Sequence, residues 1–71
     1  MAERIRLLDV VALTKGLPRQ RLRRGQVGTV TEALAPHVFE VEFCDNDGRT
    51  YASVALSGKQ LMVLHHEPVG A

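Results

Sequence analysis

The sequence predicts a small all-β domain built from five short strands. Turn-forming residues recur at short, fairly regular intervals along the chain, which is typical of small all-β proteins. Residues 38–43 (VFEVEF) alternate apolar and acidic side chains, and a period of two indicates a strand with one buried face. A chain of 71 residues allows a single domain with one small core.

The first strand is expected over residues 5–13 (IRLLDVVAL). A helical turn followed by a strand would also fit this apolar run. A strand is favoured because Val10 and Val11 are β-branched and disfavour a helix. The run also ends just before Thr14, Lys15 and Gly16, where a turn is expected.

A long loop is expected over residues 15–24, because Gly16 and Pro18 interrupt any regular element. Pro18 also holds the preceding Leu17 away from a helical backbone conformation. Leu17 and Leu22 are the only large apolar residues of the loop, so we expect them to attach it to the domain.

The second strand is expected over residues 25–34 (GQVGTVTEAL). A glycine within a strand usually marks a bulge, a tight bend or a close backbone approach, and Gly25 and Gly28 would supply such a bend. A short turn at residues 35–37 then leads into the strand at residues 38–43.

Residues 45–48 (DNDG) predict the tight turn of a hairpin, since Asn, Asp and Gly tolerate positive φ. The chain returns as a fourth strand at residues 49–56 (RTYASVAL). An EF-hand calcium loop would need a closing glutamate and flanking helices, and the sequence supplies neither. We therefore expect a turn here and no calcium site.

Residues 57–60 predict a compact connection with one 3-10 turn, and residues 61–64 (LMVL) predict the fifth strand. Residues 1–64 would form the domain, and residues 65–71 a flexible tail. This order of elements is that of a small five-stranded SH3-like barrel with a long first loop and one short 3-10 turn before the last strand. The expected core residues are Val10, Ala12, Val27, Val30, Phe39, Val41, Phe43, Val54, Leu61 and Val63.

Two groups of motifs in the chain resemble known families. Residues 23–43 resemble the KOW-type and related SH3-like segments of ribosomal and transcription-elongation proteins, through RRGQVGTVTEAL followed by VFEVEF. Nearly the whole chain is similar to a family of small bacterial proteins of unassigned function, through DVVAL, LP, GQVGTV, FEVEF and the DGRT step. The second resemblance implies a free-standing SH3-like β-barrel, allows an antitoxin-like or immunity-like role, and assigns no catalytic residue. Arg19, Arg21 and Arg23 depart from the family pattern.

Charge is unevenly distributed, although the net charge is only +1. The first loop gathers five of the nine basic residues, which are Lys15, Arg19, Arg21, Arg23 and Arg24. They could form a solvated loop, contact an acidic protein, or contact phosphates. Single-stranded nucleic acid would also require aromatic platforms, and the chain has only three aromatic residues. Glu40 and Glu42 share one face of a strand, where they could oppose a basic partner or simply confer solubility.

The sequence favours no enzymatic chemistry. Cys44 lies near Glu40 and Glu42, and neighbouring carboxylates raise rather than lower the pKa of a thiol. Adjacent His65 and His66 would point in opposite directions on a strand. We therefore expect no catalytic residue, no metal site and no cofactor. The absence of tryptophan argues against an aromatic groove for proline-rich peptides.

These observations predict a non-enzymatic protein-binding module. Its partner would be an unidentified protein, such as a toxin, or a second copy of the chain forming a homo-oligomer. The alternative is an RNA- or ribosome-associated KOW-like domain that binds phosphate through the basic first loop. The single cysteine, the lack of a secretory signal and the short apolar stretches predict a cytoplasmic protein without a membrane partner.

Overall fold

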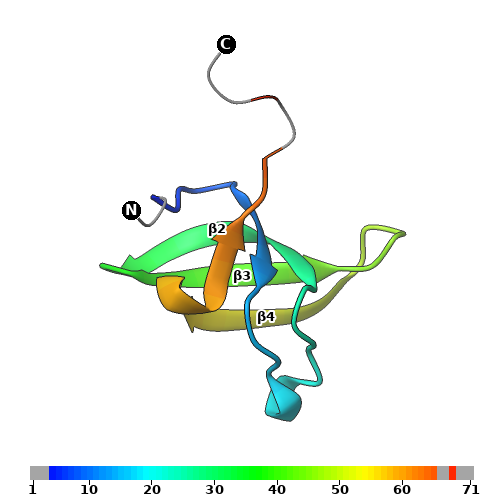
Figure 1. Cartoon of the computed structure of the whole chain (residues 1–71). Coiled ribbons are helices and arrows are strands. Elements are labelled where there is room, and N and C mark those ends of the chain that lie inside the picture. Colours follow the sequence, from blue (N-terminus) through cyan, green and yellow to red (C-terminus); the bar gives the residue numbers. More distant parts are fainter. Residues whose placement is uncertain (1–3, 66–67, 69–71) are drawn as a thin grey trace.

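The computed structural model describes residues 4–65 and residue 68, and it is all-β (Figure 1). Its sheet contains five strands, and each of two connections carries one short 3-10 helix. The elements are β1 (Val10–Leu13), η1 (Pro18–Gln20), β2 (Val27–Ala35), β3 (Val38–Cys44), β4 (Thr50–Ser57), η2 (Gly58–Gln60) and β5 (Leu61–Val63). The five strands and the 3-10 turn before the last one confirm the predicted fold class, whereas η1 was not predicted.

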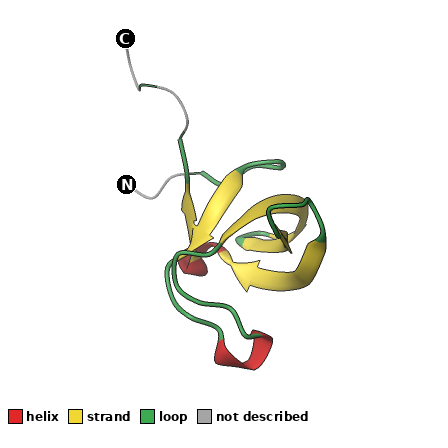
Figure 2. Ribbon diagram, turned by 90° about the vertical axis from the view of Figure 1, so that its right-hand side faces the viewer, coloured by secondary structure: helices red, strands yellow, loops and turns green. Residues whose placement is uncertain are grey.

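All neighbouring strands are antiparallel, in the order β4-β3-β2-β1-β5. The two edge strands of this order, β4 and β5, are joined by only the three residues of η2. So short a connection can join opposite edges only if the sheet curls, and Figure 2 shows this curl. Within the described residues no strand pairing joins β4 to β5, so backbone pairing does not close the expected barrel.

The bending of the sheet follows from irregular strand pairing. The register of β2 against β3 shifts twice, between Val30 and Glu32 and between Ala33 and Ala35. A third shift separates Phe43 from Cys44 in the pairing of β3 with β4. Each extra residue bends its strand and increases the local twist, which lets the long strands wrap around one core.

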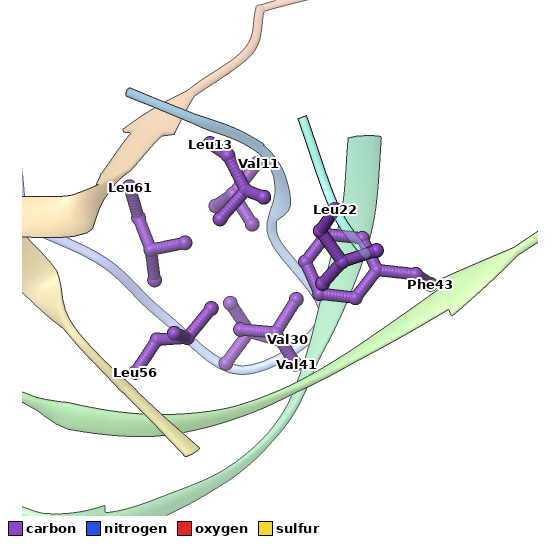
Figure 3. Close-up of a cluster of buried hydrophobic side chains, with 8 residues drawn as sticks. All are labelled: Val11, Leu13, Leu22, Val30, Val41, Phe43, Leu56 and Leu61. Atoms are coloured by element: carbon purple, nitrogen blue, oxygen red, sulfur yellow. The ribbon is translucent and has the colours of Figure 1, made fainter. Parts of the chain in front are cut away.

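The core lies on the concave face of the curled sheet (Figure 3). Every strand contributes to it, and the loop between β1 and β2 adds one more side chain. Its buried members are Val11, Leu13, Leu22, Val30, Val41, Phe43, Leu56 and Leu61. Ala12 is buried as well, outside this cluster. The predicted core residues Ala12, Val30, Val41, Phe43 and Leu61 are therefore confirmed as buried.

The other predicted core residues are not fully buried. Phe39, Val54 and Val63 are half-buried against the cluster, and Val10 is also only half-buried. Val27 is 46% exposed, because its neighbour Gly28 is the residue that faces the core side chains of β3.

The predicted phase of the first strand is wrong. In β1 it is Val11 and Leu13 that enter the core cluster, rather than Val10 and Ala12. Since successive residues of a strand point to opposite faces, Val11 and Leu13 share the face that enters the cluster, and Ala12 is buried on the other face. In VVAL the residues of both faces are apolar, so the sequence pattern could not show which face enters the core.

The first strand is also shorter than predicted, because residues 6–9 form a turn and residues 4–5 lie outside any strand. The backbone N–H of Arg6 donates to a carboxylate oxygen of Asp9 over 2.8 Å, and the N–H of Asp9 donates to the carbonyl of Arg6 over 3.1 Å. Leu8 within this turn has a φ of 69°. The strand begins only after this turn, at Val10.

Gly25 was predicted to begin the second strand, but it lies outside β2. It adopts a φ of 90° in the turn before β2, a conformation that favours glycine. Gly28 does mark a close approach within β2. A Cβ atom at that position would stand 2.7 Å from a side-chain carbon of Val41 and 2.8 Å from the carbonyl oxygen of Glu42.

No helix in the described part of the chain is long and apolar enough to cross a membrane. Of the predicted tail, His65 and Pro68 are exposed. Residues 66–67 and 69–71, on which most of the flexible-tail prediction falls, lie outside the described residues.

Candidate functional site

Residues 15–24 form a projection that we call the basic finger, and it extends away from the sheet in Figures 1 and 2. Leu17 and Leu22 pair across it through two backbone hydrogen bonds of 2.8 and 3.1 Å. The Leu22 side chain is only 3% exposed and belongs to the core, and Leu17 packs against that core. The prediction that these two leucines attach the loop to the domain is therefore confirmed.

The tip of the basic finger is a single 3-10 turn. Pro18 begins η1, where its missing N–H costs no hydrogen bond. Arg21 ends η1 in the left-handed conformation, with a φ of 60°, and its N–H donates to the carbonyl of Pro18 over 3.1 Å. This geometry places Arg19 and Arg21 at the end of the finger.

The structure brings the five predicted basic residues onto this one projection. All five are exposed, namely Lys15, Arg19, Arg21, Arg23 and Arg24. Within the described residues, none of their side chains takes part in an ion pair or a hydrogen bond. The finger therefore presents positive charge that the described part of the chain does not neutralise.

Gln26 anchors the root of the finger. Its side-chain oxygen accepts a hydrogen bond from the backbone N–H of Arg23, and its backbone N–H donates to the carbonyl of Arg23 over 3.1 Å. Its side-chain amide donates to the hydroxyl of Tyr51 over 2.9 Å. Since Tyr51 is the second residue of β4, this bond places the root of the finger beside the beginning of that edge strand.

The outer edge of β4 is a second candidate feature. Residues 52–57 pair with β3 in six successive register positions without a bulge. Within the described residues the opposite edge of β4 pairs with no strand. The strand (TYASVALS) contains no charged residue and no proline. Proteins usually protect edge strands with charge, proline, bulges, short length or a covering segment. In the described structure only the end of the β4 edge is occupied, where the backbone N–H of Ser57 donates to the side-chain oxygen of Gln60 in η2 over 2.9 Å.

The other edge strand provides a direct contrast. β5 has only three residues, so it offers few backbone groups for pairing with a further strand. Of the two edge strands in the described sheet, β4 therefore offers the longer and more regular edge to an additional strand.

The side chains of β4 divide between the two faces of the sheet. Ala52 and Val54 lie opposite the core residues Phe43 and Val41, yet both remain half-exposed. Ser53 and Ala55 alternate with them and are exposed. A strand added at this edge would thus meet apolar side chains on the concave face and small side chains on the convex face.

Glu40 and Glu42 lie on the convex face of β3, as their alternation predicted, and each is half-buried. Glu32 of β2 stands directly opposite Glu40 and extends this acidic group. The sequence did not predict that Glu32 lies opposite Glu40, because the position of Glu32 relative to β3 depends on a bulge in β2. The Glu42 carboxylate accepts a hydrogen bond of 3.1 Å from the Thr50 hydroxyl, so it is partly occupied within the sheet.

The Asp45 carboxylate stabilises the turn that begins at this residue, and the turn predicted at residues 45–48 is confirmed. One of its oxygens accepts from the backbone N–H groups of Asp47 and Arg49, each over 2.9 Å. Gly48 has a φ of 81°, and its N–H donates to the Asp45 carbonyl over 3.0 Å.

Within the described residues, no group of three or more His, Cys, Asp and Glu side chains could hold a metal ion. Cys44 is exposed and free, with its sulfur 3.5 Å from the Thr50 hydroxyl oxygen. His66, the second residue of the predicted histidine pair, lies outside the described residues.

A shallow hollow of about 1170 Å³ lies between the β2–β3 turn and η2. Its lining is mostly apolar and includes Leu34, Pro36 and Phe39. The charged or titratable residues that line it are Arg4, His37 and Lys59, with no carboxylate among its described lining residues. Ser57 also lines the hollow, and its hydroxyl oxygen accepts a hydrogen bond from the backbone N–H of Lys59 over 3.3 Å.

The geometry thus defines a small curled-sheet domain with a basic projection and an open strand edge. A family model described as a domain of unknown function (DUF4926) matches residues 7–63, which is most of the chain. The chain belongs to this family. Comparisons with curated proteins and with solved structures found no match.

Proposed function

We propose that this protein is a non-enzymatic protein-binding module that receives an extended segment of its partner along the edge of β4. The single observation that carries the proposal is the regular, uncharged and proline-free edge at residues 52–57. Apart from the Ser57 N–H, which Gln60 already accepts, such an edge presents a row of backbone donors and acceptors to a further strand. Strand addition of this kind is a common mode of peptide recognition, with backbone hydrogen bonds for affinity and side-chain contacts for specificity.

Backbone hydrogen bonds alone would bind such a segment weakly. Each contributes roughly 0.5–1.5 kcal/mol net, while association costs roughly 4–15 kcal/mol in lost freedom of motion. Apolar side chains of the partner packing on Ala52 and Val54 would supply part of the difference. Charged groups near the edge would then provide the specificity for one partner.

A photo-crosslinking experiment tests the proposal. A photoreactive side chain at Ser53 is expected to crosslink to one specific protein in extracts of the organism that encodes this chain. The same group at Leu34, which is exposed but lies on β2, is the matched control. The additional substitution Ala55→Lys places a charge on the exposed face of the edge and should abolish the crosslink. Equal crosslinking from both positions, or a product that persists with Ala55→Lys, would contradict the proposal.

Self-association and an antitoxin-like role are two forms of this proposal. Two copies could pair along their β4 strands about a two-fold axis, because the same edge is then used on both molecules. Light scattering would then give twice the 7.8 kDa of one chain, and Ala55→Lys would restore the monomer. An antitoxin-like or immunity-like role requires that the crosslinked protein be toxic when produced alone.

The element order supports assigning the fold as SH3-like: five antiparallel strands, a long loop after the first, and a 3-10 turn before the last. A cytoplasmic location also remains part of the proposal, supported by the single cysteine, which is free in the structure.

RNA binding through the basic finger is the second candidate function. The observation that favours it is the group of five exposed cations without partners in the described residues. If four or five phosphates are neutralised, the logarithm of the affinity should fall steeply with the logarithm of the salt concentration. Changing Arg19 and Arg21 to Gln should flatten this slope. The absence of RNA binding at low salt would eliminate this candidate.

A further inference from the structure

We infer that the partner segment lies antiparallel to β4 and that its C-terminal end carries carboxylates that contact the basic finger. This inference rests on the proposed function and specifies the chemistry of the partner. It follows from the direction of β4, the position of the finger root and the charges around the beginning of that strand.

The direction of β4 determines which end of the partner approaches the finger. The strand runs from Thr50 to Ser57, and Tyr51 near its beginning is hydrogen-bonded to Gln26 at the finger root. An antiparallel neighbour would enter beside Ser57 and leave beside Thr50. Antiparallel pairing is preferred here because it is slightly more stable per residue and every other pair in the sheet is antiparallel. The C-terminal end of the added segment would therefore lie beside the finger.

The charge of the finger defines the class of group that this end must carry. Arg23 lies at the root, where its N–H donates to the side-chain oxygen of Gln26 and its carbonyl accepts from the Gln26 N–H. Its side chain has no partner within the described residues. Guanidinium groups bind carboxylates through paired hydrogen bonds, and such charge-assisted bonds are about twice as strong as neutral ones. Aspartate, glutamate and a free C-terminal carboxylate all fit this chemistry.

Acidic groups near the same end of β4 restrict the path of the segment. Glu42 accepts its hydrogen bond from Thr50 on the convex face, and Asp47 is exposed in the adjacent turn. Tyr51 is 49% exposed, and its ring centroid lies 6.4 Å from that of the buried Phe43. Glu42 and Asp47 would repel a carboxylate on the convex side, and the finger would attract it on the Tyr51 side. Arg49, exposed directly before Thr50, adds one cation outside the finger at this end. The partner segment is thus expected to turn its acidic end toward the concave side.

A selection from random peptides with free C-termini tests the inference, using peptides of about ten residues that can cover the edge and reach the finger. The intact protein is expected to enrich peptides with alternating apolar residues followed by a C-terminal acidic end. The finger variant carries Arg19→Gln, Arg21→Gln, Arg23→Gln and Arg24→Gln. This variant should still enrich peptides with alternating apolar residues, but without a preference for an acidic C-terminal end. It should bind the best acidic peptide at least about tenfold more weakly than the intact protein does.

Matched controls separate this inference from the proposed function. Arg6→Gln with Lys59→Gln removes two exposed cations outside the finger and should leave the selection unchanged. Ala55→Lys should abolish the enrichment of peptides altogether. If the intact protein enriches no peptide relative to Ala55→Lys, both the proposed function and this inference are overturned. Enrichment without an acidic end, or an acidic preference that survives in the finger variant, would overturn only the inference. Binding of an RNA oligonucleotide that requires the finger but not the β4 edge, with no peptide enriched, would also overturn both.

Discussion

The side-chain amide of Gln26 donates a hydrogen bond of 2.9 Å to the hydroxyl of Tyr51, which lies 25 positions further along the chain. The same glutamine accepts a hydrogen bond from the backbone N–H of Arg23. One side chain therefore joins the basic finger to the beginning of the open edge strand. The edge that carries the proposed function and the finger that the further inference adds to it share a structural connection.

Replacing Gln26 with Ala should loosen the finger. The substitution removes the acceptor for the Arg23 N–H and the donor to Tyr51, and each lost bond costs roughly 0.5–1.5 kcal/mol. We expect the free energy of unfolding to fall by about 1–2 kcal/mol and the amide of Arg23 to exchange faster with solvent. Chemical denaturation and hydrogen exchange measure the two effects.

The control for this prediction is Gln20→Ala, at an exposed position in η1 for which no side-chain hydrogen bond exists within the described residues. It should leave both quantities nearly unchanged. Equal exchange rates at Arg23 in Gln26→Ala and in the unsubstituted protein would show that Gln26 does not order the finger.

Replacing Gly28 with Ala should destabilise the domain by about 1–3 kcal/mol through overpacking. The new Cβ would stand 2.7 Å from a Val41 carbon and 2.8 Å from the Glu42 carbonyl oxygen, so β2 and β3 would have to separate. Gly16→Ala is the matched control, since its nearest atoms would be at 3.6 and 3.8 Å. Thermal unfolding of both variants checks the prediction, and a similar loss in both would contradict the close approach at Gly28.

Phe43 and Phe39 should differ when each is truncated to Ala. Phe43 is fully buried, so its loss should cost about 3–5 kcal/mol, most of the stability available to a domain of this size. Phe39 is only half-buried, so its loss should cost clearly less. Urea titration of the two variants measures the difference. Equal costs would mean that the burial of the two rings is not as described.

Replacing Asp45 with Ala should weaken the β3–β4 turn. Its carboxylate accepts two backbone hydrogen bonds, and losing them should cost about 1–2 kcal/mol. Asp47→Ala removes an equal charge from the same turn, but the Asp47 carboxylate has no hydrogen bond within the described residues. Denaturation midpoints compare the two variants. A loss of stability with Asp47→Ala as large as with Asp45→Ala would point to the charge rather than the hydrogen bonds.

The acidic alternation in VFEVEF allowed the faces of β3 to be predicted correctly, because one phase is polar and only the other can be buried. The DNDG turn was equally predictable, since Asp45 and Gly48 stabilise a reversal through local bonds and local backbone freedom. The predicted basic residues do gather on one loop, because they are close in sequence.

Other features required the tertiary structure. The apolar residues of β1 fit either face, so the burial of Val11 rather than Val10 was decided by packing against the other strands. The pairing of Glu32 with Glu40 depends on a bulge that shifts the register of β2.

By itself the sequence determined the all-β class, the positions of the turns and the concentration of positive charge in one loop, because these depend on neighbouring residues. Only the tertiary structure decided that β4 is the long open edge and that Tyr51 joins it to the basic finger. Strand order and contacts between distant positions depend on how the whole chain minimises its exposed apolar surface, and no local pattern encodes that result.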